Sequence, residues 1–381
     1  MHRAAIQIEA LSHMPDVLLA ETDTCPQNRY STSAAMLHSH FTFSILEGAK
    51  GAKHWITRPA SELNVGKAYR KKLEKYSGFY RKLASLNDSL TWLGCKIPVP
   101  QKPKYILTPA DGSADGCGWY GHVLDRFGLP MHFSNRGEGV CFFDSGRDAF
   151  FSDDELKEFL SGKVVLDGVA AERFAYRGFG KYLGVEVKRR EANAPNASGE
   201  IFYPGEPSKA QYGLRELIPL SDDVKRYSDV YHLRDGVYKD IMFPGVTSYK
   251  NELGGTVVVF AGNTDFDYNL SEAFGFLNET RKNQLVRILS DLDALPVYCP
   301  EDAEILMKAA RMQDGKLLCA LLDMSLDPIE ELQLVIRGDV KSIARLNCNG
   351  KFENVAFTRD GERFTLDIKV DPFDPLILVV E

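Results

Sequence analysis

The sequence lacks the usual marks of a metal, redox or membrane protein. Its seven cysteines include no C-x-x-C pair, and no pair of histidines accompanies them, which argues against a zinc site or a redox dithiol. We therefore expect reduced thiols, as in a cytoplasmic protein. No apolar run approaches the ~20 residues that a membrane span needs. The first twenty residues contain no compact apolar stretch followed by a cleavage site, so no signal peptide is predicted.

The sequence also lacks a strong excess of either charge. Lys and Arg together number 46 and Asp and Glu number 53, so the formal net charge is −7. A mildly acidic chain has no long-range attraction for nucleic acid or for an anionic membrane, and we expect neither as a partner. Hydrophobic residues make up 44% of the 381 positions and charged residues 26%, which is typical of globular domains. This length predicts two or three domains.

The first part of the chain, residues 1–97, alternates apolar runs with helical patterns. Residues 16–20 and 52–57 are predicted as strands, and residues 33–46 between them as a helix. A later helix carries apolar side chains at steps of four and three on one face, namely Tyr69, Leu73, Tyr76, Tyr80 and Leu83. Alternation of this kind predicts crossover units on parallel strands.

The second part, residues 98–295, continues this alternation, so we expect a parallel sheet covered by helices. Ser152 and Glu155 form the S-x-x-E pattern of a capping box, which predicts the start of a helix. The polar stretch 188–210 contains three prolines and is predicted as a loop. Strands are predicted at residues 104–108, 131–134, 163–166 and 255–261, and helices at 118–129, 170–183 and 279–292.

The last part, residues 296–381, has no helical pattern. Its short apolar segments are separated by Asp314-Gly315, Asn349-Gly350 and Asp360-Gly361. Asn-Gly and Asp-Gly pairs suit tight hairpin turns, because both tolerate a positive φ. The pattern predicts a small antiparallel β-sandwich.

The strongest candidate site follows the first predicted strand. An apolar run leads to Glu21, and a polar loop with Asp23, Asn28 and Arg29 comes next. A carboxylate at the carboxyl end of a parallel barrel strand lies where such barrels hold their active sites. Alternatively, Glu21 caps a helix or pairs with Arg29, which would be a structural role.

The second predicted strand also leads to functional side chains, His54, Trp55 and Arg58. A Trp near a carboxylate suits a sugar, because the indole ring stacks on the apolar face of a pyranose. The carboxylate of Glu21 would then attack or stabilise the anomeric carbon.

Three segments resemble glycoside hydrolase family 42 and its relatives. LLAETDTCPQNRYS, beginning at Leu18, resembles the seventh strand of the barrel, whose terminal Glu is the nucleophile; that position is Glu21 here. ILEGAKGAKHWITR resembles the eighth strand, which ends in Trp55 and Arg58. FGFLNETRKNQLVRIL, residues 274–289, resembles the segment that precedes the sandwich.

This resemblance implies an α/β protein in three parts. Residues 1–97 would be the last two strands of a (β/α)8 barrel, residues 98–295 an amidotransferase-like trimerisation domain, and residues 296–381 a β-sandwich. It implies a retaining, β-galactosidase-like glycosidase that forms a homotrimer, acts on a carbohydrate and uses no cofactor or metal. Glu21 would be the nucleophile, and the substrate-binding residues would be Asp23, Asn28, Arg29, His54, Trp55 and Arg58.

The chain departs from this family in one important way. A complete barrel needs ~250 residues and eight strands, whereas residues 1–97 hold two. The family's acid/base Glu lies on the fourth strand, which has no counterpart here, and retaining hydrolysis needs two carboxyl groups. We therefore expect this chain alone to be inactive unless another segment completes the barrel. The alternative is a non-catalytic remnant that keeps an oligomerisation role.

Other candidate sites are weaker. Cys117 follows a predicted strand, but no late His-x-Glu completes an amidotransferase triad, so we expect a buried structural residue. The run GSADGCG does not match G-x-G-x-x-G, and no dinucleotide site is predicted. His38 and His40 are two residues apart on a predicted helix and do not share a face. We expect one of them to be a hydrogen-bonded core histidine.

Overall fold

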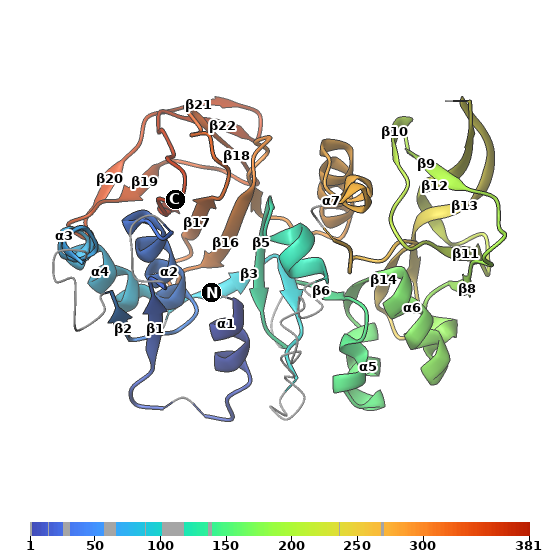
Figure 1. Ribbon diagram of the computed structural model, residues 1–381, viewed down its shortest axis with the longest axis horizontal. Coiled ribbons are helices and arrows are strands. Elements are labelled where there is room, and N and C mark those ends of the chain that lie inside the picture. The colour runs from blue at the N-terminus through green and yellow to red at the C-terminus, as the bar shows by residue number, and fades with distance from the viewer. Residues whose placement is uncertain are drawn as a thin grey trace. The chain divides into compact units, whose positions relative to one another are not determined.

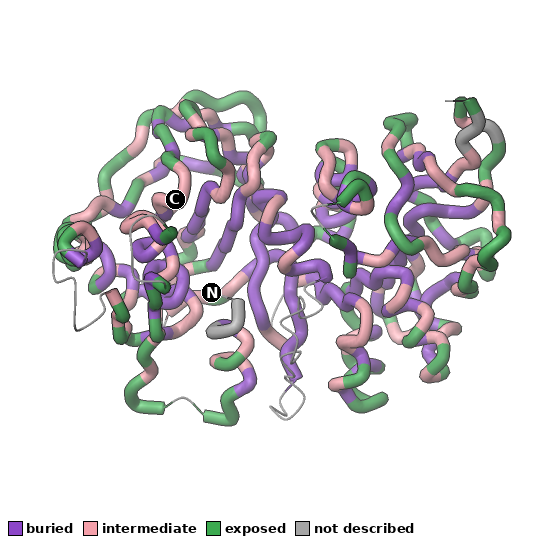
Figure 2. The backbone as a smooth tube through the Cα atoms, in the orientation of Figure 1, coloured by how far each residue is buried: buried purple, intermediate pink, exposed green. Residues whose placement is uncertain are grey.

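The computed structural model describes residues 2–13, 15–25, 31–56, 66–87, 89–100, 118–135, 139–235, 237–267 and 270–381 (Figure 1). The chain divides into two compact units. Unit 1 contains residues 1–94, 126–137 and 296–381, and unit 2 contains residues 95–125 and 138–295. Buried residues follow the central strands of each unit (Figure 2). No helix in the described segments is long and apolar enough to cross a bilayer.

The amino-terminal part of unit 1 contains a two-stranded parallel sheet. Strands β1 (Leu19–Asp23) and β2 (Gly51–Trp55) pair in parallel, as the sequence predicts, and α2 (Ala34–Leu46) connects them. Ser33 caps α2 by accepting a hydrogen bond from the backbone N–H of Met36 at 3.0 Å. The first strand begins three residues later than predicted, so Glu21 lies in its middle and Asp23 at its end. The short helix α1 (His2–Glu9) precedes this sheet.

The predicted amphipathic helix is two helices, α3 (Lys67–Lys75) and α4 (Ser77–Asn87), which break at Tyr76. Its apolar face is as predicted, with Tyr69 and Leu83 fully buried. Tyr80 and Leu83 of that face pack against strands of the carboxyl-terminal sandwich (Figure 1). A Cβ on Gly78 would lie 2.5 Å from the carbonyl oxygen of Asn349, so this close approach requires glycine.

The rest of unit 1 contains two sheets whose strands from residues 296–381 pair in antiparallel fashion, whereas β5 (Phe127–Phe133) joins one of them in parallel with β16 (Ile305–Arg311). All three predicted turns join neighbouring antiparallel strands. Side chains of both sheets form one apolar core. One sheet has the order β5, β16, β17 (Leu317–Asp323), β23 (Leu376–Val380), β19 (Ile343–Leu346) and β20 (Phe352–Asn354), with β3 (Thr91–Leu93) also on β16. The other has the order β15 (Val297–Tyr298), β18 (Leu332–Ile336), β22 (Arg363–Leu366) and β21 (Phe357–Asp360).

Unit 2 is a mixed sheet with helices. Its parallel strands are β4 (Cys95–Ile97), β6 (Val140–Phe143), β7 (Lys163–Leu166) and β14 (Thr256–Phe260). The antiparallel strands β13 (Val237–Lys250), β12 (Lys225–Arg234), β9 (Ala197–Phe202) and β10 (Glu206–Lys209) extend this sheet from β14. Strands β8 (Val185–Arg189) and β11 (Arg215–Pro219) form a separate pair.

The helices of unit 2 follow the sequence pattern where local signals are strong. Ser152 and Glu155 form the predicted capping box at the start of α5 (Asp153–Leu160). The other helices are α6 (Gly168–Phe174), α7 (Glu279–Asp291), the π-helical turns η2 (Trp119–Leu124) and η4 (Ala175–Phe179), and the 3₁₀ turns η3 (Arg147–Phe150), η5 (Gly180–Tyr182) and η6 (Ser271–Gly275).

Two predictions about these segments are wrong. The helix predicted over residues 118–129 ends at Leu124, and Phe127 begins the fully buried strand β5. Gly128 has a φ of +64° and Pro130 lacks an N–H, so neither suits a helix. The stretch 188–210, predicted as a loop, contains the last two residues of β8 and all of β9 and β10. The predicted strand 104–108 lies outside the described residues.

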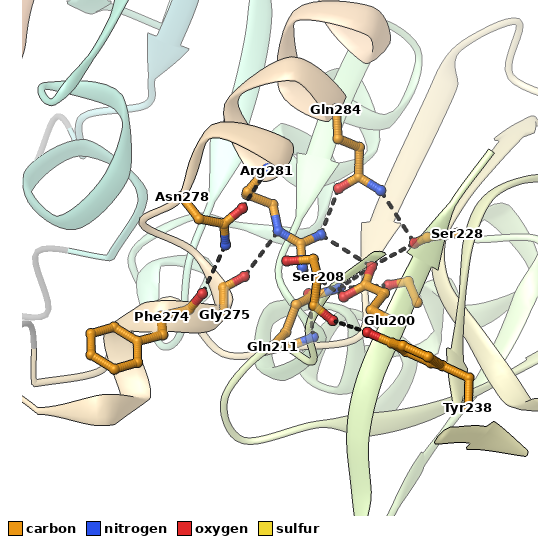
Figure 3. A network of polar contacts seen from close by, with 12 residues as sticks. Glu200, Ser208, Gln211, Ser228, Tyr238, Phe274, Gly275, Asn278, Arg281 and Gln284 are labelled. Atoms are coloured by element: carbon orange, nitrogen blue, oxygen red, sulfur yellow. Dashed lines mark hydrogen bonds and ion pairs between the residues drawn. The ribbon is translucent and has the colours of Figure 1, made fainter. Parts of the chain in front are cut away.

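A buried ion pair ties β9 to α7 in unit 2 (Figure 3). Arg281 donates to both carboxylate oxygens of Glu200, at 2.6 and 3.1 Å, and both side chains are fully buried. The remaining donors of Arg281 reach the carbonyl of Gly275 and the side chain of Gln284. Ser228 of β12 donates to Glu200 at 2.6 Å. A buried pair is stabilising only when its other hydrogen-bonding groups are also satisfied, and this network meets that condition.

We expect Arg281→Met to destabilise unit 2 strongly, because it leaves the Glu200 carboxylate buried without its cation. Removing one partner of a buried pair costs about 3–5 kcal/mol. Hydrogen exchange of peptides from β9 and α7 measures the change. The control is Lys181→Met, which breaks the exposed pair with Glu252 and should leave exchange unchanged. Equal exchange in both variants would contradict the prediction.

Candidate active site

Strand alternation places the candidate residues on two faces of the β1–β2 sheet. The register pairs Glu21 with Lys53 and Asp23 with Trp55. Successive strand residues point to opposite faces, so these four side chains share one face. That face is open: the side chains of Glu21 and Lys53 are 58% and 70% exposed, and Trp55 is 48% exposed. Glu21, in the middle of β1, therefore shares this open face with Asp23 and Trp55, the last residues of the two strands.

His54 lies on the opposite face, which α2 covers. A hydrogen bond joins its Nδ1 to the hydroxyl of buried Thr22, its partner in the strand register. The ring of Phe41 on α2 packs edge-on against the imidazole, with 4.9 Å between ring centroids. Burial lowers the pKa of His54 below its ordinary value. These contacts fix the register of β1 and β2, and they separate His54 from the face that carries Glu21.

Lys53 is a residue of the open face that the sequence reasoning missed. Its Nζ lies 3.8 Å from Oε2 of Glu21. The sequence contains the information needed to find it. Once residues 51–55 are recognised as a strand, positions 53 and 55 must lie on the same face. An ion pair between two exposed groups stabilises the fold little. Its role here is to place a positive charge beside the carboxylate.

Three predicted site residues, Asn28, Arg29 and Arg58, lie outside the described residues, as does Cys117. The pairing of Glu21 with Arg29, the structural alternative for this carboxylate, therefore stays a prediction.

Glu47 is the next acidic residue along the chain after Asp23, but it lies elsewhere. It follows α2 as its cap, and its carboxylate pairs with Lys308 on β16. Both side chains are nearly buried, and the Lys308 ammonium also lies 4.8 Å from the ring of Trp92. Glu47 therefore joins the end of α2 to β16, and it does not lie on the open face.

His38 is the buried histidine that the sequence predicts on α2. Its side chain is fully buried, and Nδ1 is hydrogen-bonded to the hydroxyl of Tyr80 at 2.8 Å. Burial, with smaller contributions from Lys72 and Lys75, lowers the pKa of His38 to about 3. The imidazole is therefore neutral at pH 7 and serves the core.

The parallel strands of unit 2 also end in carboxylates, Asp144 after β6 and Asp167 after β7. Asp167 is fully buried and accepts hydrogen bonds from Ala170 N at 2.7 Å and Thr264 Oγ1 at 2.9 Å; burial raises its pKa to about 7. Asp144 accepts from Arg147 Nε at 3.0 Å, and burial raises its pKa as well. The carboxylates of Asp144 and Asp167 therefore serve hydrogen bonds inside unit 2. Across the described part of the chain, no group of three or more metal-ligating side chains is placed to hold a metal ion.

The fold is shared with a solved glycoside hydrolase. The sequence matches no protein-family model and no curated protein. α-L-Fucosidase isoenzyme 2 from Paenibacillus thiaminolyticus aligns with 92% of this chain at 13% identity, with a TM-score of 0.56. A rhamnosidase from Novosphingobium sp. PP1Y aligns with 93% of the chain at 10% identity, with a TM-score of 0.43.

At 13% identity, the alignment with the fucosidase shows a shared fold and nothing finer. The TM-score of the rhamnosidase alignment is too low to support a comparison of folds. The chain spans 58% of the length of the fucosidase.

We expect His54 to titrate below pH 6.5, its ordinary pKa, because burial disfavours the charged imidazolium. Between pH 7 and 5 the unfolded chain then binds more protons at this site than the folded chain, so its contribution to stability falls as the pH falls. NMR titration of the imidazole Cε1–H signals measures the pKa, and His54→Gln assigns the peak. A pKa at or above 6.5 would place His54 on the solvent-exposed face.

Proposed function

We propose that this chain is part of a retaining glycoside hydrolase in which Glu21 is the nucleophile. The observation that carries the proposal is the open face of the β1–β2 sheet, where Glu21, Asp23 and Trp55 lie together. The fold shared with a fucosidase supports it, and so does the resemblance of the strand motifs to glycosidase family 42. The site would take a carbohydrate.

The chemistry follows from the residue types on this face. The carboxylate of Glu21 attacks the anomeric carbon as the glycosidic C–O bond breaks and the leaving group departs as an alcohol; water then hydrolyses the resulting glycosyl ester and regenerates the carboxylate. The indole of Trp55 packs against the apolar face of the sugar ring. Asp23 accepts hydrogen bonds from sugar hydroxyls, and Lys53 donates to them while holding a positive charge 3.8 Å from Glu21.

The reaction also needs a second carboxyl group to protonate the leaving oxygen. Further barrel strands would supply that group and cover the open face. The sugar is proposed only as a class: the structural neighbour is named for α-L-fucose, whereas the motifs resemble β-galactosidases.

A non-catalytic role is the second candidate, and one observation favours it. The described residues of the barrel-like part form only two parallel strands, which is too few to close a sugar site. In this case the chain keeps an assembly role without hydrolysis.

We expect no substantial turnover from this chain alone, because one carboxylate cannot serve as both nucleophile and leaving-group acid. The assay is release of 4-nitrophenol from aryl α-L-fucosides and aryl β-D-galactosides. A turnover number in the ordinary enzyme range, about 1–1000 per second, would contradict the expectation and point to Asp23 as the acid.

We expect Glu21→Gln to abolish turnover in a form whose barrel is completed by additional strands, in cis or in trans. Loss of the nucleophile removes the covalent step and lowers kcat by several orders of magnitude. Lys53→Met is the matched control on the same face and should lower kcat far less. Near-normal activity of Glu21→Gln, with circular dichroism unchanged, would remove the nucleophile assignment.

We expect self-association, with three copies as the resemblance implies. The aromatic helix residue Tyr80 does not supply the motive, because it packs against strands of the sandwich within the same chain. The remaining motive is the open β1–β2 face, where Leu19 and Trp55 are half-exposed. Light scattering after size exclusion measures the mass, and a monomer of 42.6 kDa at micromolar concentration would contradict the prediction.

A further inference from the structure

A cavity of about 360 Å³ lies within unit 1, and none of its lining residues belongs to β1 or β2. One wall comes from α3 and α4, with Lys75, Tyr76 and Phe79. The turn between β19 and β20 forms the second wall, and residues 368–376 form the third. This volume lies within the range of small-molecule sites, roughly 300–1,000 Å³.

The bottom of the cavity is apolar and well fixed. Five of its lining side chains are less than a tenth exposed, namely Phe79, Leu346, Ile368, Val370 and Leu376. The backbone N–H of Phe79 donates to the carbonyl of Cys348 at 3.2 Å, which holds the turn against α4. The walls are thus held by core packing and a backbone hydrogen bond. The cavity is therefore preformed and needs no rearrangement of its walls to bind a ligand.

Polar groups of both signs surround this apolar floor. Three cations and three anions line the cavity, namely Lys75, Arg345, Lys369, Glu353, Asp371 and Asp374. Burial raises the pKa of Tyr76 to about 12, with further contributions from Asp374 and Cys348, so its hydroxyl stays protonated and can donate. The rim therefore offers both donors and acceptors, and the formal charges of its six ionisable side chains cancel.

We propose that this cavity binds a neutral, monosaccharide-sized polyol, a second carbohydrate site separate from the Glu21 face. Balanced charge gives no attraction for a phosphate or a cationic ligand. Sugar hydroxyls both donate and accept, which suits a mixed rim, and the ring's C–H groups suit the partly exposed aromatic ring of Tyr76.

A second cavity of unit 1 provides a comparison. It measures about 390 Å³ and also has charges of both signs, including Arg311 and Asp314, but no aromatic residue lines it. Because it lacks the stacking surface, we expect it to bind sugars more weakly, and Arg311→Ala becomes the matched control.

The test uses Cys348, a partly exposed thiol in the cavity wall, as a reporter, with exposed Cys25 as the internal control. The chain is alkylated with iodoacetamide, with and without methyl α-L-fucoside, methyl β-D-galactoside or methyl α-D-glucoside, and peptide mass spectrometry gives each rate. With a bound sugar at about ten times its dissociation constant, the Cys348 rate falls about tenfold. The rate at Cys25 stays unchanged.

Variants assign the protection to this cavity. Arg345→Ala and Asp371→Ala change exposed rim residues and should abolish it, while Arg311→Ala should leave it intact. Glu21→Gln should also leave it intact, so failure of the proposed active site and failure of this one are distinguishable. Three results would overturn the inference: no protection by any of these sugars, equal protection of Cys25, or protection that survives both rim variants.

Discussion

The arrangement of the candidate site depends on which face of the parallel β1–β2 sheet is covered by a helix. Parallel strands are normally buried on both faces, yet β1 and β2 are covered by α2 on one face and open on the other. The hydrogen bond between Thr22 and His54 fixes their register on the covered face. That register brings Glu21, Asp23 and Trp55 together on the open one. The same arrangement supports the proposed chemistry, in which further strands would cover the open face.

The sequence predictions that are correct rest on short-range patterns, such as helix caps and turns. The capping box at Ser152 and the Asp314-Gly315 turn act within a few residues, so their outcome does not depend on distant parts of the chain. Strand β9 was missed because its inner side carries Glu200, a charged residue that interrupts an apolar pattern. Its partner Arg281 is 81 positions away, and only the folded chain shows that the pair is buried and satisfied.

The candidate site was predictable to a similar extent. The order of residues along the chain singled out Glu21 and Trp55 as candidate site residues. Because side chains alternate between the two faces of a strand, the sequence also contains the information that His54 lies on the other face and Lys53 on the open one. The partner of the apolar helix face with Tyr80 and Leu83 was not predictable, because an apolar stripe does not specify what it packs against. The sandwich that covers it comes from more than 200 residues further along the chain.

The most direct test of the central claim is covalent trapping of the nucleophile. A 2-deoxy-2-fluoro glycosyl fluoride has a leaving group that needs no acid, so it reports the nucleophile independently of any acid/base residue. The reagent is applied in fucosyl and galactosyl forms to a form of the protein in which the proposed barrel is completed, and the labelled peptide is located by mass spectrometry. The account predicts a single glycosyl ester on Glu21. A label on Asp23 or on any other carboxylate, with Glu21 unmodified, would contradict it.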